Sequence, residues 1–161
     1  MRRSGFWCCV DPGVSGTGYA MLERKKLLRY GNVYPEKECE TWEQKSSSVL
    51  LKLQIALYPL VAPYRVYIEW PSQFTGAKGL AAANSNDILK LSCLIGRLTQ
   101  FFVNQGSVVI TVPVQRWKGN LPKNIVAKRA KKFFGIEKLT SHSADAVGLA
   151  QYVLKEGSRG Y

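Results

Sequence analysis

The feature that most constrains the fold is an uninterrupted apolar run at residues 6–10, which ends in an acidic residue. Such a run is typical of a β-strand covered on both faces, as in parallel sheets flanked by helices. The run stops at Asp11-Pro12-Gly13, which is a turn signal. A carboxylate at the end of a buried strand costs free energy unless it is paired or binds a cation. The segment therefore predicts a buried strand that presents a functional acid.

The remaining pattern predicts a mixed α/β domain. We expect further strands at residues 19–22, 27–34, 65–69 and 107–112, and helices at 41–60, 79–104, 124–134 and from 140 or 141 to 154. Three strands are followed by crossover helices that alternate with strands, so helices should cover both faces of one sheet. We expect residues 1–161 to form a single domain.

The charge is strongly positive and unevenly distributed. The chain has 23 Lys and Arg against 11 Asp and Glu, a net charge of +12. Residues 70–135 contain ten basic residues and one acid, Asp87. This asymmetry attracts phosphate backbones and makes binding salt-dependent. A basic face that keeps a protein in solution, or a ribosome-associated protein, would show the same excess. Charge therefore favours a nucleic-acid partner without defining the activity.

The cysteines and the hydropathy point to the cytoplasm. Cys8 and Cys9 lie in the first predicted strand, and the four cysteines lack the spacing of metal ligands, so we expect reduced thiols. No apolar stretch reaches the roughly 20 residues of a membrane-spanning helix, and no signal peptide is recognisable. We expect a cytoplasmic protein with no membrane partner, in a prokaryotic cell or a phage-infected host.

Three acids stand apart because their surroundings are apolar. Asp11 ends the first predicted strand, Glu69 ends the strand at residues 65–69, and Asp145 lies in the first turn of the last predicted helix. The carboxyl ends of parallel strands meet at one sheet edge, where ligands bind. Individually, the three acids have ordinary interpretations as a turn residue, a surface salt bridge and a helix cap. Together they favour one acidic site.

Oxygen ligands of this kind suit Mg²⁺ or Mn²⁺. Two such ions, roughly 4 Å apart, activate water and stabilise the leaving oxygen of a phosphodiester. His142 precedes Asp145 by three residues and shares its helix face, so it could ligate a second metal or transfer a proton. An isolated His here would be a capping or surface residue. The predicted catalytic and metal-binding residues are Asp11, Glu69, His142 and Asp145.

Three segments resemble motifs of the RuvC-type Holliday-junction resolvases of the ribonuclease-H-like superfamily. Residues 10–20 (VDPGVSGTGYA) are similar to the first-strand motif, in which D-P-G is followed by T-G. Residues 67–69 (YIE) resemble the I-E segment, and residues 143–150 (SADAVGLA) resemble the closing A-D-A-x-x-L-A helix. Order and spacing also match, so the resemblance extends from about residue 6 to residue 154.

The resemblance implies a ribonuclease-H-like α/β fold, with a five-stranded mixed sheet flanked by helices on both faces. It implies a crossover junction endodeoxyribonuclease of recombination and repair, which cuts a four-way DNA junction by paired symmetric nicks. It also implies Mg²⁺, with Mn²⁺ as a substitute and two ions per site. The family's metal-binding acids carry over onto Asp11, Glu69 and Asp145, and its fourth active-site position carries over onto His142.

The resemblance further implies a homodimer. The family's dimer helix corresponds to the stretch from Leu80 to Phe102. The predicted helix at 79–104 carries more apolar residues than one face accommodates, which is consistent with contact to a partner chain.

Two segments carry the implied DNA contacts. Lys118 and Lys123 match two lysines of the family, and Arg116 lies in the same stretch. A bulky Trp117 beside Lys118 departs from the family pattern. The basic residues of the following helix, at 128–132, also fit an ordinary solvated helix face.

In the family, the loop after the catalytic Glu holds an aromatic residue that stacks on junction bases, and the resemblance implies such a residue here. Trp70 and Phe74 are candidates, with Phe74 the better placed, and Gln73 lies beside it. Trp70 would equally fit the core. Pro71 and extra residues make this loop unlike that of the family, which leaves the stacking residue open.

Three other interpretations compete with a junction resolvase. Actin-like ATPases also open with D-x-G and T-G, but they need a second such domain. A related nuclease acting on RNA or on other branched DNA would share the same metal centre. A non-catalytic junction-binding protein would have no need of all four polar site residues.

Overall fold

The computed structural model describes residues 5–57, 63–71 and 86–157. Five strands form one mixed sheet in the order β3-β2-β1-β4-β5. Strands β1, β2 and β3 form an antiparallel meander, and β4 and β5 continue the sheet parallel to β1. Their bounds are β1 Phe6–Asp11, β2 Thr17–Glu23, β3 Lys26–Val33, β4 Arg65–Trp70 and β5 Val108–Pro113.

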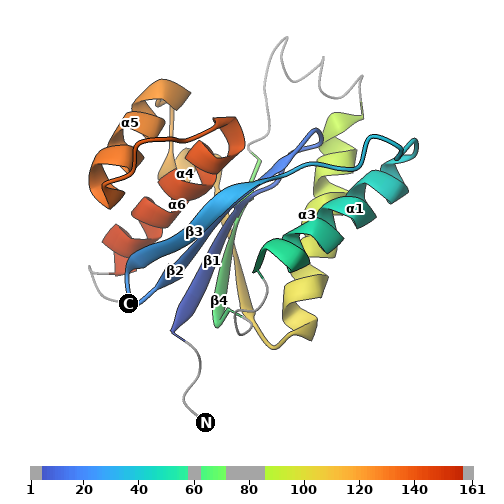
Figure 1. Cartoon of the computed structure of the whole chain (residues 1–161), viewed down its shortest axis with the longest axis horizontal. Helices are drawn as coiled ribbons and strands as arrows, with labels where there is room; N and C mark the ends of the chain where they lie inside the picture. Colours follow the sequence, from blue (N-terminus) through green and yellow to red (C-terminus); the bar gives the residue numbers. More distant parts are fainter. Residues whose placement is uncertain (1–4, 58–62, 72–85, 158–161) are drawn as a thin grey trace.

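Helices cover both faces of this sheet, as Figure 1 shows. The helices α1 and α3 lie on one side, and α4, α5 and α6 lie on the other. Their bounds are α1 Trp42–Leu57, α3 Asp87–Asn104, α4 Val114–Trp117, α5 Lys123–Phe134 and α6 Ser141–Gly157. The predicted fold class, a five-stranded mixed sheet between helices, is confirmed.

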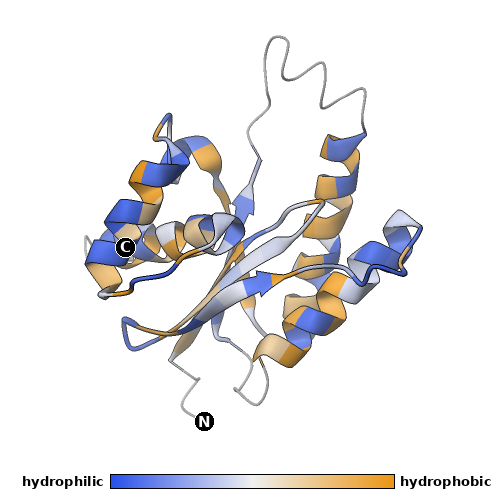
Figure 2. Ribbon diagram, turned by 45° about the horizontal axis from the view of Figure 1, so that its top comes forward, coloured by the Kyte–Doolittle hydropathy of each residue, from blue (hydrophilic) through white to orange (hydrophobic). Residues whose placement is uncertain are grey.

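The first strand is apolar throughout because it faces two cores. Cys8 and Val10 lie in the core beneath α1 and α3, whereas Cys9 lies in the core beneath α6. Successive side chains of a strand point to opposite faces, so the residues facing either side of the sheet must be apolar here. The covering helices mix polar and apolar residues (Figure 2), and they bury apolar side chains against the sheet while α1 and α3 also expose some, such as Leu51 and Leu89.

Most predicted boundaries hold within one or two residues. Pro122 precedes α5, and Gly135 ends it with a φ of 66°, a left-handed conformation that glycine adopts without steric cost. The parts of the first two predicted helices at residues 58–60 and 79–85 lie outside the described residues. Among the helices that the structure describes, none has the length and apolarity needed to cross a membrane.

Candidate active site at the carboxyl ends of β1 and β4

Two of the predicted acids are neighbours at one sheet edge. In the parallel β1–β4 ladder, Val10 pairs with Ile68, and the next residues along the two strands are Asp11 and Glu69. Both acids point toward the face that carries α6, since Cys9 and Tyr67, two residues before Asp11 and Glu69 respectively, lie in the core beneath that helix. Asp11 is 6% exposed, so its carboxylate is almost completely removed from solvent.

Helix α6 brings the third acid to the same place. Ser143 in its first turn accepts a 3.0 Å hydrogen bond from the Thr140 N–H, which fixes the helix start. A Cβ at Gly18 of β2 would lie 2.1 Å from the His142 carbonyl oxygen, so only glycine permits this close approach. Asp145 is 3% exposed and points inward from α6.

One detail of the prediction for Asp145 is wrong. No acidic residue lies in the first turn of α6, so Asp145 belongs to the second turn. A carboxylate in this position is beyond the helix's free N–H groups and does not act as a cap. The ordinary explanation of Asp145 as a helix cap is thereby removed.

His142 joins the acids from the first turn of α6. Its Nδ1 lies 3.3 Å from Asp11 Oδ2, and the imidazole is 22% exposed at the side-chain level. An ionised Asp11 accepts this hydrogen bond from the Nδ1–H group, which ties the ring to the end of β1. The structure thus brings the four predicted site residues together, while their catalytic and metal-binding roles remain predictions.

Two lysines neutralise Asp145. Lys118 Nζ lies 2.7 Å from Asp145 Oδ1, and Lys123 Nζ lies 3.2 Å from Asp145 Oδ2. The Lys118 side chain is 12% exposed and the Lys123 side chain is 59% exposed. Burial lowers the pKa of Lys123, but the Asp145 carboxylate outweighs this effect and the net shift is upward. Both lysines that the family resemblance singled out therefore lie at the acidic site.

The three carboxyl groups are close enough to perturb one another. Burial raises the pKa of Glu69 to about 8, and the negative charges of Asp11 and Asp145 act in the same direction. The ammonium of Lys118 opposes this shift. Burial also raises the pKa of Asp11, against the hydrogen bond from His142. Removal from water and mutual repulsion both disfavour the charged forms of these carboxyl groups. An additional positive charge bound at the site would stabilise the ionised carboxylates.

These residues suit a hard divalent cation in their chemistry but do not form a ready-made cage. Among the described residues, no three His, Cys, Asp or Glu side chains are arranged so that they already enclose a metal ion. The donors are buried carboxylates, which Mg²⁺ and Mn²⁺ prefer, and the ammonium of Lys118 holds one of the oxygens of Asp145. A cation bound here would compete with that ammonium, so side chains would have to rearrange.

One site residue was not assigned a role from the sequence. The Trp117 indole Nε1–H donates a hydrogen bond to Glu69 Oε2, with 3.1 Å between the two atoms. The signal in the sequence was its bulk, which departs from the family pattern beside Lys118. Spacing alone does not show that residues 117 and 69 meet, because the contact depends on how β5 and α4 follow β4.

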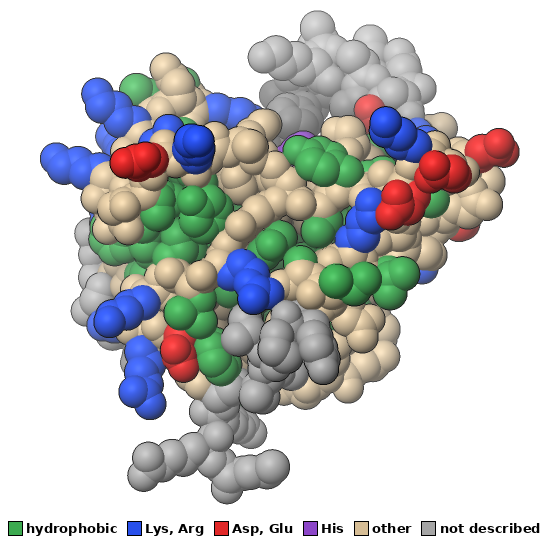
Figure 3. Space-filling view, in the orientation of Figure 1, with side chains coloured by type: hydrophobic (Ala, Val, Ile, Leu, Met, Phe, Trp, Pro, Cys, Tyr) green, Lys and Arg blue, Asp and Glu red, His purple; other side chains and the backbone are tan. Residues whose placement is uncertain are grey.

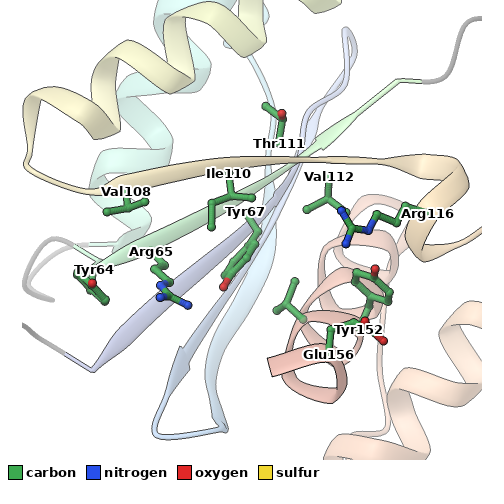
Figure 4. A pocket seen from close by; sticks show the side chains of 11 residues that line it. Tyr64, Arg65, Tyr67, Val108, Ile110, Thr111, Val112, Arg116, Tyr152 and Glu156 are labelled. Atoms are coloured by element: carbon green, nitrogen blue, oxygen red, sulfur yellow. The ribbon is translucent and has the colours of Figure 1, made fainter. Parts of the chain in front are cut away.

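The other predicted DNA-binding residues are placed differently. Arg116 lines a cavity of about 390 Å³ between β4, β5 and α6, where it lies near Tyr152 (Figure 4). Trp70 is 43% exposed, so its interpretation as a core residue is wrong. Gln73 and Phe74 lie outside the described residues.

The charged surface is also divided between the two sides of the molecule. In Figure 3, basic side chains gather on the side where α5 lies, whereas acidic side chains gather near the start of α1. A phosphate backbone that approached from the α5 side would meet an attractive field.

Comparison with known proteins identifies the fold. No protein-family model and no curated sequence matches the chain. Among solved structures, it is similar to Thermus thermophilus RuvC in complex with a Holliday-junction substrate, with a TM-score of 0.72, 19% identity and 96% of both chains covered. A second T. thermophilus RuvC structure gives a TM-score of 0.69 and 20% identity over 94% of this chain and 96% of that one. Ydc2, the yeast mitochondrial Holliday-junction resolvase, gives a TM-score of 0.50 and 13% identity, with 97% of this chain and 83% of that one covered.

The chain therefore has a ribonuclease-H-like α/β fold, with carboxylates gathered at the ends of its central parallel strands. More specifically, it has the fold of RuvC. The resemblance predicted from three short motifs is confirmed at the level of the fold.

Proposed function

We propose that this protein is a divalent-metal-dependent endonuclease that resolves four-way DNA junctions by paired symmetric nicks. The observation that carries the proposal is the meeting of Asp11, Glu69 and Asp145, from three separate elements, at the edge of a RuvC-like sheet. The choice of substrate is supported by the T. thermophilus RuvC structure, which contains a Holliday junction. The proposal extends to its location, the cytoplasm of a prokaryotic cell or a phage-infected host.

Asp11, Glu69 and Asp145 would hold Mg²⁺ or Mn²⁺, with two ions per site. The bound cations supply Lewis-acid stabilisation of the scissile phosphate and of the leaving oxygen. Glu69 must be ionised to serve as a ligand, and its pKa of about 8 means that binding releases a proton near neutral pH. His142 is held to Asp11 through Nδ1, which orients the imidazole to accept or return a proton.

The two lysines would bind and orient the phosphate. In the protein without DNA, Lys118 and Lys123 pair with the two oxygens of Asp145. With Asp145 engaged as a metal ligand, both ammonium groups would be free to interact with an incoming phosphate oxygen. Lys123 is the more exposed of the two, so it would meet the DNA first.

We propose a homodimer formed through α3, which holds the described part of the dimer segment predicted at Leu80 to Phe102. Leu89 is 69% exposed and Val103 is 49% exposed, although Leu94 and Leu98 on the same helix are fully buried. The exposed face also carries Cys93 and Gly96, small residues that permit two helices to approach closely. Two active sites related by a dyad would account for paired nicks in opposed strands.

The proposal is tested with synthetic DNA and RNA substrates. Purified protein is incubated with a four-way junction, a linear duplex, a flap and an RNA–DNA hybrid, each with Mg²⁺, with Mn²⁺ and with chelator. We expect metal-dependent nicks at symmetric positions of the junction and little cleavage of the linear duplex. Preferential cleavage of the hybrid or the flap would favour a related nuclease with the same metal centre. Tight junction binding without cleavage under any condition would favour a binding protein.

A further inference from the structure

The chain holds one bulky residue against the candidate site in a fixed position. Trp117 ends α4, a single turn that directly follows β5. The Lys118 N–H donates a 2.9 Å hydrogen bond to the Val114 carbonyl oxygen, and the Gly119 N–H donates one of 3.1 Å to the same oxygen. Gly119 has a φ of 56°, which lets the chain turn away immediately after the tryptophan. The backbone therefore fixes where the indole starts.

The indole ring is seated between α5 and α6. A Cβ at Gly148 of α6 would lie 2.9 Å from Trp117 Cζ3 and 2.6 Å from Val126 Cγ1. Even an alanine at position 148 would thus require the ring or the helix to move. The absence of a side chain at Gly148 is what allows the outer edge of the indole to approach α6 this closely, one turn after Asp145.

The indole contacts one site acid, Glu69, directly, and it contacts Lys118, which pairs with a second site acid, Asp145. Its Nε1–H donates to Glu69 Oε2 at 3.1 Å, and an indole nitrogen can only donate. The ammonium of Lys118 lies 5.6 Å from the centroid of the same ring while it pairs with Asp145 at 2.7 Å. A cation over an indole face is electrostatically attracted to it. The ring thereby fixes one oxygen of Glu69 and restricts the position of the ammonium.

We propose that Trp117 is a positioning residue that orients Glu69 for divalent-cation binding. The proposal rests on the proposed function, because it assumes that Glu69 is a metal ligand. Groups that hydrogen-bond to metal ligands fix the ligand's orientation, and their loss costs metal affinity. The indole N–H acts in this way here, whereas a residue that merely filled the core would act through its volume alone.

The first test separates the contribution of the indole N–H group to metal binding from the contribution of the ring's volume. Trp117→Phe keeps an aromatic ring in the seat and removes the donor. We expect this variant to bind Mn²⁺ about 10-fold more weakly, in the absence of DNA, as measured from the free Mn²⁺ signal in electron paramagnetic resonance. Trp42→Phe is the matched control, because Trp42 is on α1, on the other side of the sheet, and its Nε1 has no hydrogen-bond partner among the described residues. We expect its Mn²⁺ affinity to stay within twofold of the wild-type value.

The second test is spectroscopic. In a ¹H–¹⁵N spectrum, the indole N–H signal of Trp117 is assigned by its disappearance in Trp117→Phe. We expect this signal to shift on addition of Mg²⁺, and the Trp42 signal to stay in place. Gly148→Ala crowds both Val126 and the indole ring, and we expect it to weaken Mn²⁺ binding as Trp117→Phe does.

The outcomes distinguish this proposal from the proposed function. Wild-type Mn²⁺ affinity in Trp117→Phe, with an indole signal that Mg²⁺ does not move, would overturn the role of Trp117 even if the wild-type protein resolves junctions. A shifted signal and weakened binding, without cleavage of any junction by the wild-type protein, would support Trp117 and overturn the resolvase. A wild-type protein that binds no Mn²⁺ would overturn both.

Discussion

Lys118 and Asp145 form an ion pair inside the protein, with 2.7 Å between Nζ and Oδ1 and side chains that are 12% and 4% exposed. A buried pair of this kind stabilises little by itself, but removing one partner leaves a charge without compensation. In this protein the pair also stands where the proposed cation would bind. Stability, metal binding and DNA binding should therefore be linked through the same carboxylate.

The first prediction concerns Lys118→Ala. We expect the metal-free variant to lose about 2 kcal/mol of unfolding free energy, less than the ~3–5 kcal/mol of a fully broken buried pair, because Lys123 still neutralises Asp145. Junction nicking should also be weaker. The measurement is urea unfolding in chelator, together with nicking in Mg²⁺. Lys123→Ala is the control, since its side chain is 59% exposed and its loss should cost less than about 1 kcal/mol. Equal stability of the two variants would contradict the assignment.

Asp145→Asn should separate binding from cleavage. The amide has the same shape but lacks the negative charge that the proposed metal site requires. We expect nicking to fall by on the order of 10³-fold, the scale of losing one electrostatic stabiliser of a transition state. Junction binding, measured by gel shift in chelator, should be retained because the basic surface is unchanged. Nicking at the wild-type rate would remove Asp145 from the mechanism.

The pKa of Glu69 predicts a pH-dependent stability of the metal-free protein. The pKa of an unperturbed Glu is 4.5, whereas burial raises the pKa of Glu69 in the folded protein to about 8. Between these values the unfolded chain releases a proton that the folded protein retains, so stability falls as the pH rises and then levels off above about 8. The measurement is the thermal unfolding temperature in chelator, from about pH 5.5 to 8.5. We expect this temperature to fall less with rising pH in Glu69→Gln than in the wild-type protein.

Added Mg²⁺ should reverse part of this loss, because the cation binds the ionised carboxylate. Apparent metal affinity should accordingly rise with pH until Glu69 is fully ionised. A wild-type protein whose stability in chelator is as independent of pH as that of Glu69→Gln would show that this carboxyl is not perturbed.

Leu89→Glu tests the proposed dimer. The residue is 69% exposed on α3, and a charge there should disrupt a helix–helix interface. We expect a monomer in sedimentation velocity and loss of the paired character of the nicks. Leu51→Glu on α1, at a residue 58% exposed, is the control and should leave the mass unchanged. Identical masses for both variants would exclude this face of α3 as the dimer surface.

Much of the fold could be predicted because the local patterns are strong. The run ending at Asp11 is apolar at both parities, which defines a doubly covered strand, and Pro122 and Gly135 bracket α5 with residues suited to its two ends. The helix α4 was missed because a single turn has no periodicity to detect. The predicted start of the last helix, at residue 140 or 141, agrees with the observed start of α6 at Ser141, but Asp145 is the fifth residue of the helix and so lies just beyond its first turn.

The candidate site was predictable in its members but not in its contacts. Chain order and strand polarity bring Asp11 beside Glu69 without any knowledge of side-chain conformation. The hydrogen bond from Trp117 and the pairing of Lys118 depend on rotamers and on how α4 packs against α6. No periodicity encodes such contacts between residues far apart in the chain.

The position of β1 in the centre of the sheet has a consequence for synthesis on the ribosome. This strand emerges first, yet its parallel partner β4 and the helix α6 that covers it follow much later in the chain. Early in translation β1 can pair with β2 on one side, while its partner on the other side, β4, has not yet been made. Asp11 would acquire the proximity of Asp145 only once α6 has left the exit tunnel, so the candidate site would stay incomplete until that helix has emerged.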